Sequence, residues 1–285
     1  MTTATKLEKT PLAELPSSYD LEIWGKLEYL NPTGSIKYRT ARRMVMDAIE
    51  SGKLREGMRI IEHTSGNTGI ALAGLGMELG YPVTIVVGLS VTEDAKRMIK
   101  EYGAKIVQVD GYFVASEKKV KEIIAAEPDR YYWPNQVENP SSLLSNEDLG
   151  NEIADELDVN IYLASMGTGS TITGVGKALK RRNPKTRVYL VLPDGEYDVP
   201  GVDDPAESKV AMPLFDRSIV DREIRISERQ AIEATRKLHN HGYPVGVSTG
   251  ANFAAAEKIA PFASGNAVII FPDHRNRYTR IFGAE

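Results

Sequence analysis

One lysine, Lys37, lies between a turn and a helical pattern, an arrangement suited to amine chemistry. Pro32 and Gly34 predict the turn, and apolar residues spaced across 41–49 predict a helix with Ser35 as its N-cap. The positive end of the helix dipole disfavours an ammonium by about 0.3–1 kcal/mol, and burial adds to this bias. A lysine biased towards its neutral amine suits Schiff-base formation. The same pattern also fits a surface lysine in a first helical turn.

Two further segments, 62–69 and 164–174, each join a predicted strand to a predicted helix. Both contain small hydroxyl residues and glycines, which leave backbone N–H groups free at a helix N-terminus. Such an end binds anions, including phosphate and carboxylate groups. Each segment alone also fits an ordinary tight turn. Two such turns together with a positioned lysine are much harder to explain as turns alone.

Several competing motifs fit poorly. The loop at Gly167 lacks the third glycine of a dinucleotide fingerprint, because Ile172 stands there. Gly176-Lys177 is followed by Ala178 rather than by the hydroxyl residue of a triphosphate-binding loop. The four histidines have no thiolate partners and no metal-ligand spacing, so no metal site is expected.

A hydrolase is a further interpretation, because Gly246-Val247-Ser248-Thr249-Gly250 matches the G-x-S-x-G nucleophile elbow. Its acid and its histidine would both have to come from Asp273-His274. Adjacent residues point in different directions from an extended backbone, which disfavours an oriented relay.

The composition is typical of a globular enzyme, with 285 residues, 42% hydrophobic and 26% charged. A formal charge of -4 and the lack of basic runs argue against nucleic acid as a partner. No apolar run approaches the ~20 residues that span a bilayer, and residues 1–9 lack a signal-peptide core. We therefore expect a cytoplasmic protein with no membrane partner. Cysteine is absent, which excludes disulfides, thiolate metal sites and a cysteine nucleophile.

Helical patterns alternate with short β-branched runs from Lys37 onward, which predicts an α/β fold with parallel sheets between helices. The expected strands are 59–62, 83–87, 105–109, 130–133, 160–164, 187–192, 222–226 and 266–271. The expected helices are 67–79, 92–102, 114–126, 143–157, 171–182, 227–241 and 249–262. The segment 193–216 has four prolines and little periodicity, so it is interpreted as a functional loop.

Taken together, these segments resemble the fold-type II pyridoxal-phosphate enzymes, most closely the cysteine synthase (O-acetylserine sulfhydrylase) and cystathionine β-synthase family. The similarity runs from Thr10 to Asp273, with the lysine, asparagine-loop and phosphate-loop motifs in the family's order. The resemblance implies a two-lobed, tryptophan-synthase-β-like fold in a homodimer, each lobe a mainly parallel twisted sheet flanked by helices. A small mobile domain would span 32–140, and a large cofactor-anchoring domain would span 1–31 and 141–285.

The resemblance also assigns roles to the motif residues. Lys37 would bind pyridoxal 5′-phosphate and act as base and acid at the substrate Cα. Asn67 would bond the cofactor's 3′-oxygen, and Ser248 would be the neutral partner of the pyridine nitrogen. The residues implied for the cofactor phosphate are Gly167, Thr168, Gly169, Ser170 and Thr171. The residues implied for the substrate carboxylate are Thr64, Ser65, Gly66, Thr68 and Gln136.

The implied reaction is β-replacement on a β-substituted L-serine (O-acetylserine or O-phosphoserine) with sulfide, through an α-aminoacrylate, to give L-cysteine. Condensation with homocysteine, a serine/threonine dehydratase-type lyase and an idle cofactor-fold binding protein stay open as alternatives. The chain departs from the family at several positions, including Glu147–Glu152 where the family has a threonine-rich Gly-Pro-Glu segment, and the missing substrate loop leaves the donor open. Tyr38 stands where the family usually has aspartate, Ser170 replaces a glycine, and the segment 193–216 lacks a glycine-rich substrate loop.

Overall fold

The computed structural model describes residues 7–64, 66–195, 201–206 and 211–283. The described chain divides into two compact units. One contains Asn31–Ser142 with residues 7–8, and the other contains Lys9–Leu30 with Leu143–Gly283. Each unit has its own parallel sheet and hydrophobic core. The distinct roles of a mobile domain and a cofactor-anchoring domain stay predictions.

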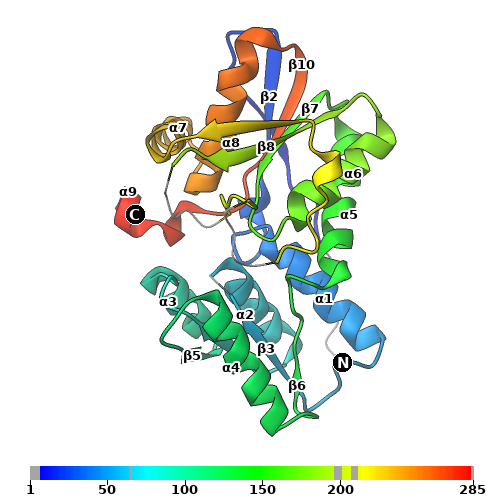
Figure 1. Ribbon diagram of the computed structural model, residues 1–285, viewed down its shortest axis with the longest axis vertical. Coiled ribbons are helices and arrows are strands. Elements are labelled where there is room, and N and C mark those ends of the chain that lie inside the picture. Colours follow the sequence, from blue (N-terminus) through cyan, green and yellow to red (C-terminus); the bar gives the residue numbers. More distant parts are fainter. Residues whose placement is uncertain (1–6, 65, 196–200, 207–210, 284–285) are drawn as a thin grey trace. The chain divides into compact units, whose positions relative to one another are not determined.

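The first unit contains a four-stranded, fully parallel sheet in the order β5-β4-β3-β6 (Figure 1). Its strands are β3 (Arg59–His63), β4 (Val83–Val87), β5 (Lys105–Gln108) and β6 (Tyr131–Tyr132). Its helices are α1 (Lys37–Glu50), α2 (Asn67–Leu79), α3 (Glu93–Glu101) and α4 (Phe113–Ala126).

Both faces of this sheet are buried. Ile60 and Ile85 belong to the core formed with α1 and α2, whereas Ile61 and Val86 pack with Val120 of α4. Successive residues of a strand point to opposite faces, so a strand covered on both sides is apolar throughout. This explains the unbroken apolar run of β4, all of which is buried.

The second unit contains a six-stranded sheet in the order β1-β2-β10-β7-β8-β9, in which only β1 is antiparallel to its neighbour. Its strands are β1 (Leu12–Leu15), β2 (Leu21–Lys26), β7 (Ile161–Ser165), β8 (Arg187–Pro193), β9 (Arg222–Ile226) and β10 (Gly265–Ile270). Its main helices are α6 (Ser170–Arg182), α7 (Glu228–Asn240) and α8 (Val247–Ile259), followed by the short α9 (Thr279–Phe282). The helix α5 (Pro140–Glu156) begins at the end of the first unit and continues into the second.

Helices also cover both faces of the second sheet. On one face, α7 and α8 pack with a core that includes Tyr189 and Val191. On the other face, a methyl group added at Gly176 of α6 would lie 3.2 Å from Val188 of β8. The α/β fold with mainly parallel sheets flanked by helices is therefore confirmed.

Two local expectations need correction. The strands β1 and β2 lie in a segment for which no strand was expected, because short runs with Gly25 and Lys26 carry a weak apolar pattern. Ser35 is not the N-cap of α1, because helical backbone already begins at Ile36 (φ -52°, ψ -26°). No side chain caps this helix, and the buried Ser35 hydroxyl has no hydrogen-bond partner among the described residues.

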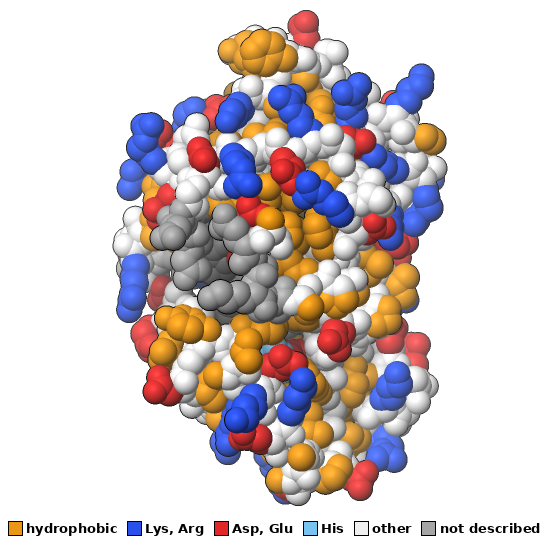
Figure 2. Space-filling model, viewed as in Figure 1, with side chains coloured by type: hydrophobic (Ala, Val, Ile, Leu, Met, Phe, Trp, Pro, Cys, Tyr) orange, Lys and Arg blue, Asp and Glu red, His pale blue; other side chains and the backbone are white. Residues whose placement is uncertain are grey.

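The surface carries charges of both signs. Figure 2 shows lysine and arginine side chains interspersed with aspartate and glutamate on the visible face. Many charged side chains of the described residues form exposed pairs, such as Arg182 with Asp155 at 2.8 Å. Among the described helices, none combines the length and apolar composition needed to cross a bilayer.

Candidate functional site

Lys37 is the first residue of α1, as the turn-to-helix pattern predicted. Its side chain is partly buried and has no ion-pair partner among the described residues. Burial lowers the pKa of the Lys37 ammonium from 10.5 to about 8. A neutral amine is therefore accessible near physiological pH, and this is the form that attacks a carbonyl.

The first unit gathers the polar residues expected for a carboxylate at the N-terminus of α2. The Gly66 N–H donates to Oγ1 of Thr64 over 3.2 Å, and no side chain caps the helix that begins at Asn67. The Thr68 hydroxyl donates to Oε1 of Gln136, and both of these side chains are buried. Thr64, Gly66, Asn67, Thr68 and Gln136 thus occupy one region, whereas Ser65 lies outside the described residues.

Glu62 is a residue of this region that the sequence did not identify. It is fully buried near the end of β3, where its Oε1 accepts the Trp133 indole N–H over 2.8 Å. Its Oε2 accepts the backbone N–H of Gln136 over 3.1 Å. The available signal was a glutamate directly after the apolar pair Ile60-Ile61 and just before the hydroxyl-rich turn.

The expected phosphate loop lies in the second unit, between β7 and α6. Its N-cap, Gly169, has φ +81°, and a methyl group added there would lie 2.5 Å from Cβ of Phe215. No side chain caps α6, so the backbone N–H groups of its first turn are available to an anion. The loop, which ends at Thr171, also carries hydroxyl groups. Those of Thr168 and Ser170 lie 3.1 Å apart.

Ser248 lies near the phosphate loop within the same unit. It is the second residue of α8 and is buried. The same helix is fastened to the end of β7, because the Ser165 N–H donates to Oδ1 of Asn252 over 2.7 Å. Gly201 lies close to both the phosphate loop and Ser248. A methyl group added at Gly201 would lie 3.9 Å from Cβ of Ser248. A methyl group added at Gly167 would lie 3.7 Å from Cα of Gly201.

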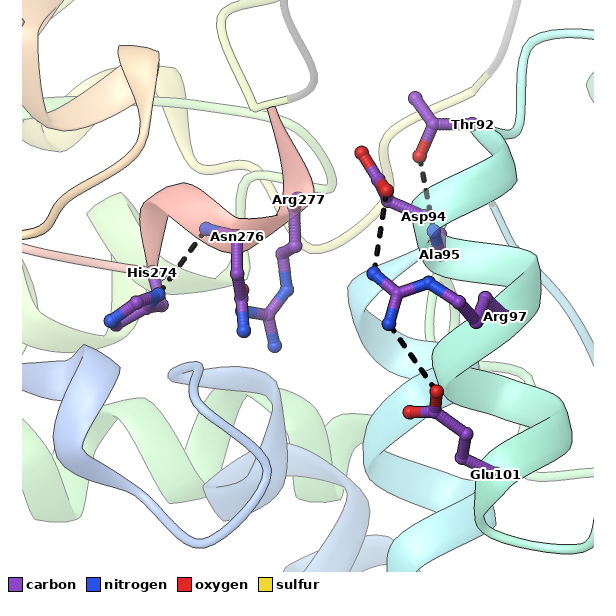
Figure 3. A network of polar contacts seen from close by, with 8 residues as sticks. All are labelled: Thr92, Asp94, Ala95, Arg97, Glu101, His274, Asn276 and Arg277. Atoms are coloured by element: carbon purple, nitrogen blue, oxygen red, sulfur yellow. Dashed lines mark hydrogen bonds and ion pairs between the residues drawn. The ribbon is translucent and has the colours of Figure 1, made fainter. Parts of the chain in front are cut away.

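The geometry does not support a hydrolase elbow at Ser248. An elbow serine sits in a strained turn, but Ser248 lies within a helix, and Asn135 alone among the described non-glycine residues has positive φ. His274 Nδ1 accepts the Asn276 N–H within its own turn (Figure 3). Asp273 accepts the hydroxyl of Tyr278 over 2.9 Å. These partners do not form a relay to Ser248.

No metal centre is evident in the described part of the chain, which contains no group of three or more histidine, aspartate or glutamate side chains suited to a metal ion.

Known proteins resemble this chain over nearly its whole length. The family described as "Pyridoxal-phosphate dependent enzyme" matches residues 4–273. Cysteine synthase of Aquifex aeolicus is 35% identical over 272 residues, which cover 91% of this chain and 83% of that protein. Cysteine synthase A of Escherichia coli is 32% identical over 293 residues, covering 94% and 90%. The O-acetylserine dependent cystathionine beta-synthase of Helicobacter pylori superposes with a TM-score of 0.85 at 31% identity, covering 96% of this chain and 95% of that one.

Proposed function

The chain belongs to the family of pyridoxal-phosphate dependent enzymes, and from this premise we propose that it converts O-acetyl-L-serine and sulfide into L-cysteine and acetate. The observation that carries the proposal is the 35% identity to a cysteine synthase over 91% of this chain. The lysine, asparagine and glycine-loop motifs lie within the matched region.

The residues present fit pyridoxal phosphate. When bound, this cofactor supplies the electron sink for breaking bonds at the amino acid's Cα and Cβ. Lys37 provides an amine with a lowered pKa, and the uncapped start of α6 provides N–H donors for a phosphate. Ser248 provides a buried neutral hydroxyl, as expected for a pyridine nitrogen that stays unprotonated. Asn67 is the proposed partner of the ring's 3′-oxygen.

The residues of the chain then have two distinct roles, proton transfer and binding of the substrate carboxylate. Lys37 removes the proton from the substrate Cα and later returns it, for which a pKa of about 8 is well matched. The N-terminus of α2 and the Gln136 amide hold the substrate carboxylate through hydrogen-bond donors. The proposed carboxylate residues are Thr64, Ser65, Gly66, Thr68 and Gln136.

Homocysteine is the second candidate acceptor. It is included because the similar O-acetylserine dependent cystathionine beta-synthase is 31% identical over nearly the whole of both chains. With that acceptor the product would be cystathionine, while the donor and the groups that hold it stay the same. We further propose that the protein is cytoplasmic and forms a homodimer; sedimentation equilibrium of the purified protein would test the dimer, and cell fractionation the location.

Steady-state assays of the purified protein with O-acetylserine, O-phosphoserine and L-serine, each with sulfide, homocysteine or no acceptor, test the function. We expect sulfide-dependent cysteine formation with O-acetylserine. Pyruvate release at the same rate with and without sulfide would show a lyase instead. Lys37→Ala should abolish turnover and the visible absorbance of the cofactor. Borohydride reduction and peptide mapping should place the cofactor on Lys37, and attachment to another lysine would refute that role.

A further inference from the structure

The Glu62 carboxylate is surrounded by hydrogen-bond donors within the first unit. The Trp133 indole and the His63 backbone N–H donate to Oε1, over 2.8 and 2.9 Å. The backbone N–H of Gln136 donates to the other carboxylate oxygen, Oε2, over 3.1 Å. A buried acid is stable only when such partners replace water, and donors alone favour its ionised form.

The turn that carries Gln136 is shaped around this carboxylate. Asn135 has φ +50°, in the left-handed region that non-glycine residues rarely adopt and that asparagine tolerates best. A left-handed residue in such a turn lets successive N–H groups converge on one anion. Here the left-handed Asn135 precedes Gln136, whose N–H points at Glu62 and donates to its Oε2 over 3.1 Å.

Gln136 connects this buried acid to the proposed carboxylate site. Its backbone is held by Glu62, and its side-chain Oε1 accepts the Thr68 hydroxyl. This hydrogen bond fixes the orientation of the amide, so that its NH₂ group remains as the donor. An amide NH₂ beside the N-terminus of α2 is suited to a carboxylate oxygen.

We propose that ionised Glu62 is a positioning residue for the amino-acid substrate, holding the turn 133–136 so that the Gln136 amide NH₂ is aligned to bind the substrate carboxylate. The inference rests on the proposed function and deepens it. Glu62 does not touch the substrate in this proposal, and its effect is on affinity for the amino acid rather than on the chemical step.

The proposal makes the site sensitive to pH. Burial raises the pKa of Glu62 to about 7, although its hydrogen bonds from Trp133 and from the backbone of Gln136, His63 and Asn135 act in the opposite direction. A protonated Glu62 has one acceptor oxygen fewer, and its O–H group faces N–H donors that it cannot accept from and donate to at once. Affinity for the amino acid should therefore fall as the pH falls through about 7.

Two neighbours of Glu62, His63 and Tyr132, titrate outside this range. Burial lowers the pKa of His63 to about 4 and raises that of Tyr132 to about 12. The charged side chains that act on these neighbours are Glu117 and Lys121 of α4, and Asp47 of α1. Lys121 also lies 6.0 Å from the centre of the Trp133 ring.

The two tryptophans of the chain provide a direct test in the cofactor-loaded protein. Trp133 donates its indole N–H to Glu62, whereas Trp24 donates to the neutral amide of Asn266 over 3.2 Å. In ¹H–¹⁵N spectra we expect the Trp133 indole signal to titrate near pH 7 in the wild type and to stay constant in Glu62→Gln. The Trp24 signal should stay constant in both. The same titration of the Trp133 signal in Glu62→Gln would show that Glu62 is not the titrating group and would overturn the pH dependence.

Steady-state kinetics test the effect of Glu62 on affinity for the amino-acid substrate. Glu62→Gln should raise KM for O-acetylserine about tenfold, change kcat less than threefold and remove the dependence of KM on pH near 7. Trp133→Phe removes one donor but keeps Glu62 and Gln136, so its KM should change less than threefold. The matched control is Glu101→Gln on α3, where Glu101 is exposed and paired with Arg97 (Figure 3).

The outcomes separate the two proposals. An unchanged KM in a folded Glu62→Gln protein would refute the positioning role while cysteine synthesis stands. If Glu62→Gln does not fold, a wild-type KM that stays constant over the pH range in which the Trp133 signal titrates would refute it equally. A wild type that binds O-acetylserine but makes no cysteine would refute the proposed function. The pH dependence of that binding would then decide the role of Glu62.

Discussion

The phenolic hydroxyl of Tyr38 donates a 2.7 Å hydrogen bond to Oε2 of Glu78, which ties α1 to α2. Tyr38 is buried, and its pKa is raised well above the usual value, first by burial and then by the bond to Glu78. One of these helices begins at Lys37 and the other at Asn67, the two residues proposed to contact the cofactor from this unit. Tyr38, which stands where the family usually has aspartate, therefore has a hydrogen-bond partner within its own unit.

We expect Tyr38→Phe to lower the free energy of unfolding by about 1 kcal/mol, because one hydrogen bond to Glu78 is lost. Tyr38→Asp should cost more, since it places a second carboxylate beside that of Glu78. Urea titrations followed by circular dichroism measure both changes. Tyr19→Phe is the control: Tyr19 is 54% exposed, so its change should stay within about 0.5 kcal/mol. Equal effects at Tyr38 and Tyr19 would contradict this prediction.

Because the pKa of Lys37 is lowered in the folded state, we expect the free energy of unfolding of the cofactor-free protein to depend on pH. Between pH 8 and 10.5 the folded state binds fewer protons at Lys37 than the unfolded state, so stability rises with pH in this range. Below pH 8 the full cost of burying the ammonium is present. Lys37→Met should therefore be more stable than the wild-type apoprotein at neutral pH, by on the order of 1–3 kcal/mol.

That advantage of Lys37→Met should shrink as the pH rises towards 10.5. Chemical denaturation of the apoproteins at a series of pH values measures it. Lys119→Met provides the control, because Lys119 is exposed and pairs with Glu122 on the surface of α4. A Lys37→Met protein less stable than the wild type at neutral pH would refute the prediction.

Ser248→Ala should keep the visible absorbance of the cofactor and lower kcat/KM by less than about tenfold, because a neutral hydrogen bond contributes about 0.5–1.5 kcal/mol. Ser248→Asp should slow turnover further, since a carboxylate favours a protonated pyridine ring. Steady-state kinetics and absorbance spectra measure these effects. Fluorophosphonate labelling of Ser248, or ester hydrolysis that needs Ser248 but not Lys37, would contradict the cofactor role.

Gly250 is explained by helix packing rather than by a nucleophile elbow. A methyl group added there would lie 2.0 Å from Oγ1 of Thr235 and 2.2 Å from the carbonyl oxygen of Ala231, both on α7. Gly250→Ala should therefore destabilise the protein by about 1–3 kcal/mol in denaturant titrations. Adding Thr235→Ala should recover only part of this loss, because the Ala231 carbonyl remains. A neutral Gly250→Ala would refute the packing account.

Local patterns were sufficient to predict most elements and the motif residues. The helix at 67–79 and the strands at 83–87 and 222–226 have the predicted bounds, because apolar periodicity and flanking turn residues specify them within a few positions. The turn-to-helix placement of Lys37 and the glycine turns before α2 and α6 are equally local, because each depends on neighbouring residues. The family resemblance rests on the order of these motifs along the chain.

Features that depend on residues far apart in sequence were decided by the tertiary structure. The strand β2 is stabilised by pairing with β10, more than 230 positions away, so its own weak pattern did not reveal it. Glu62 becomes a site residue because Trp133 and Gln136, some seventy positions later, supply its hydrogen bonds. A sequence shows a charged residue there but not its solvent exposure or its partners. Only the fold removes water from Glu62, and that desolvation raises its pKa to about 7.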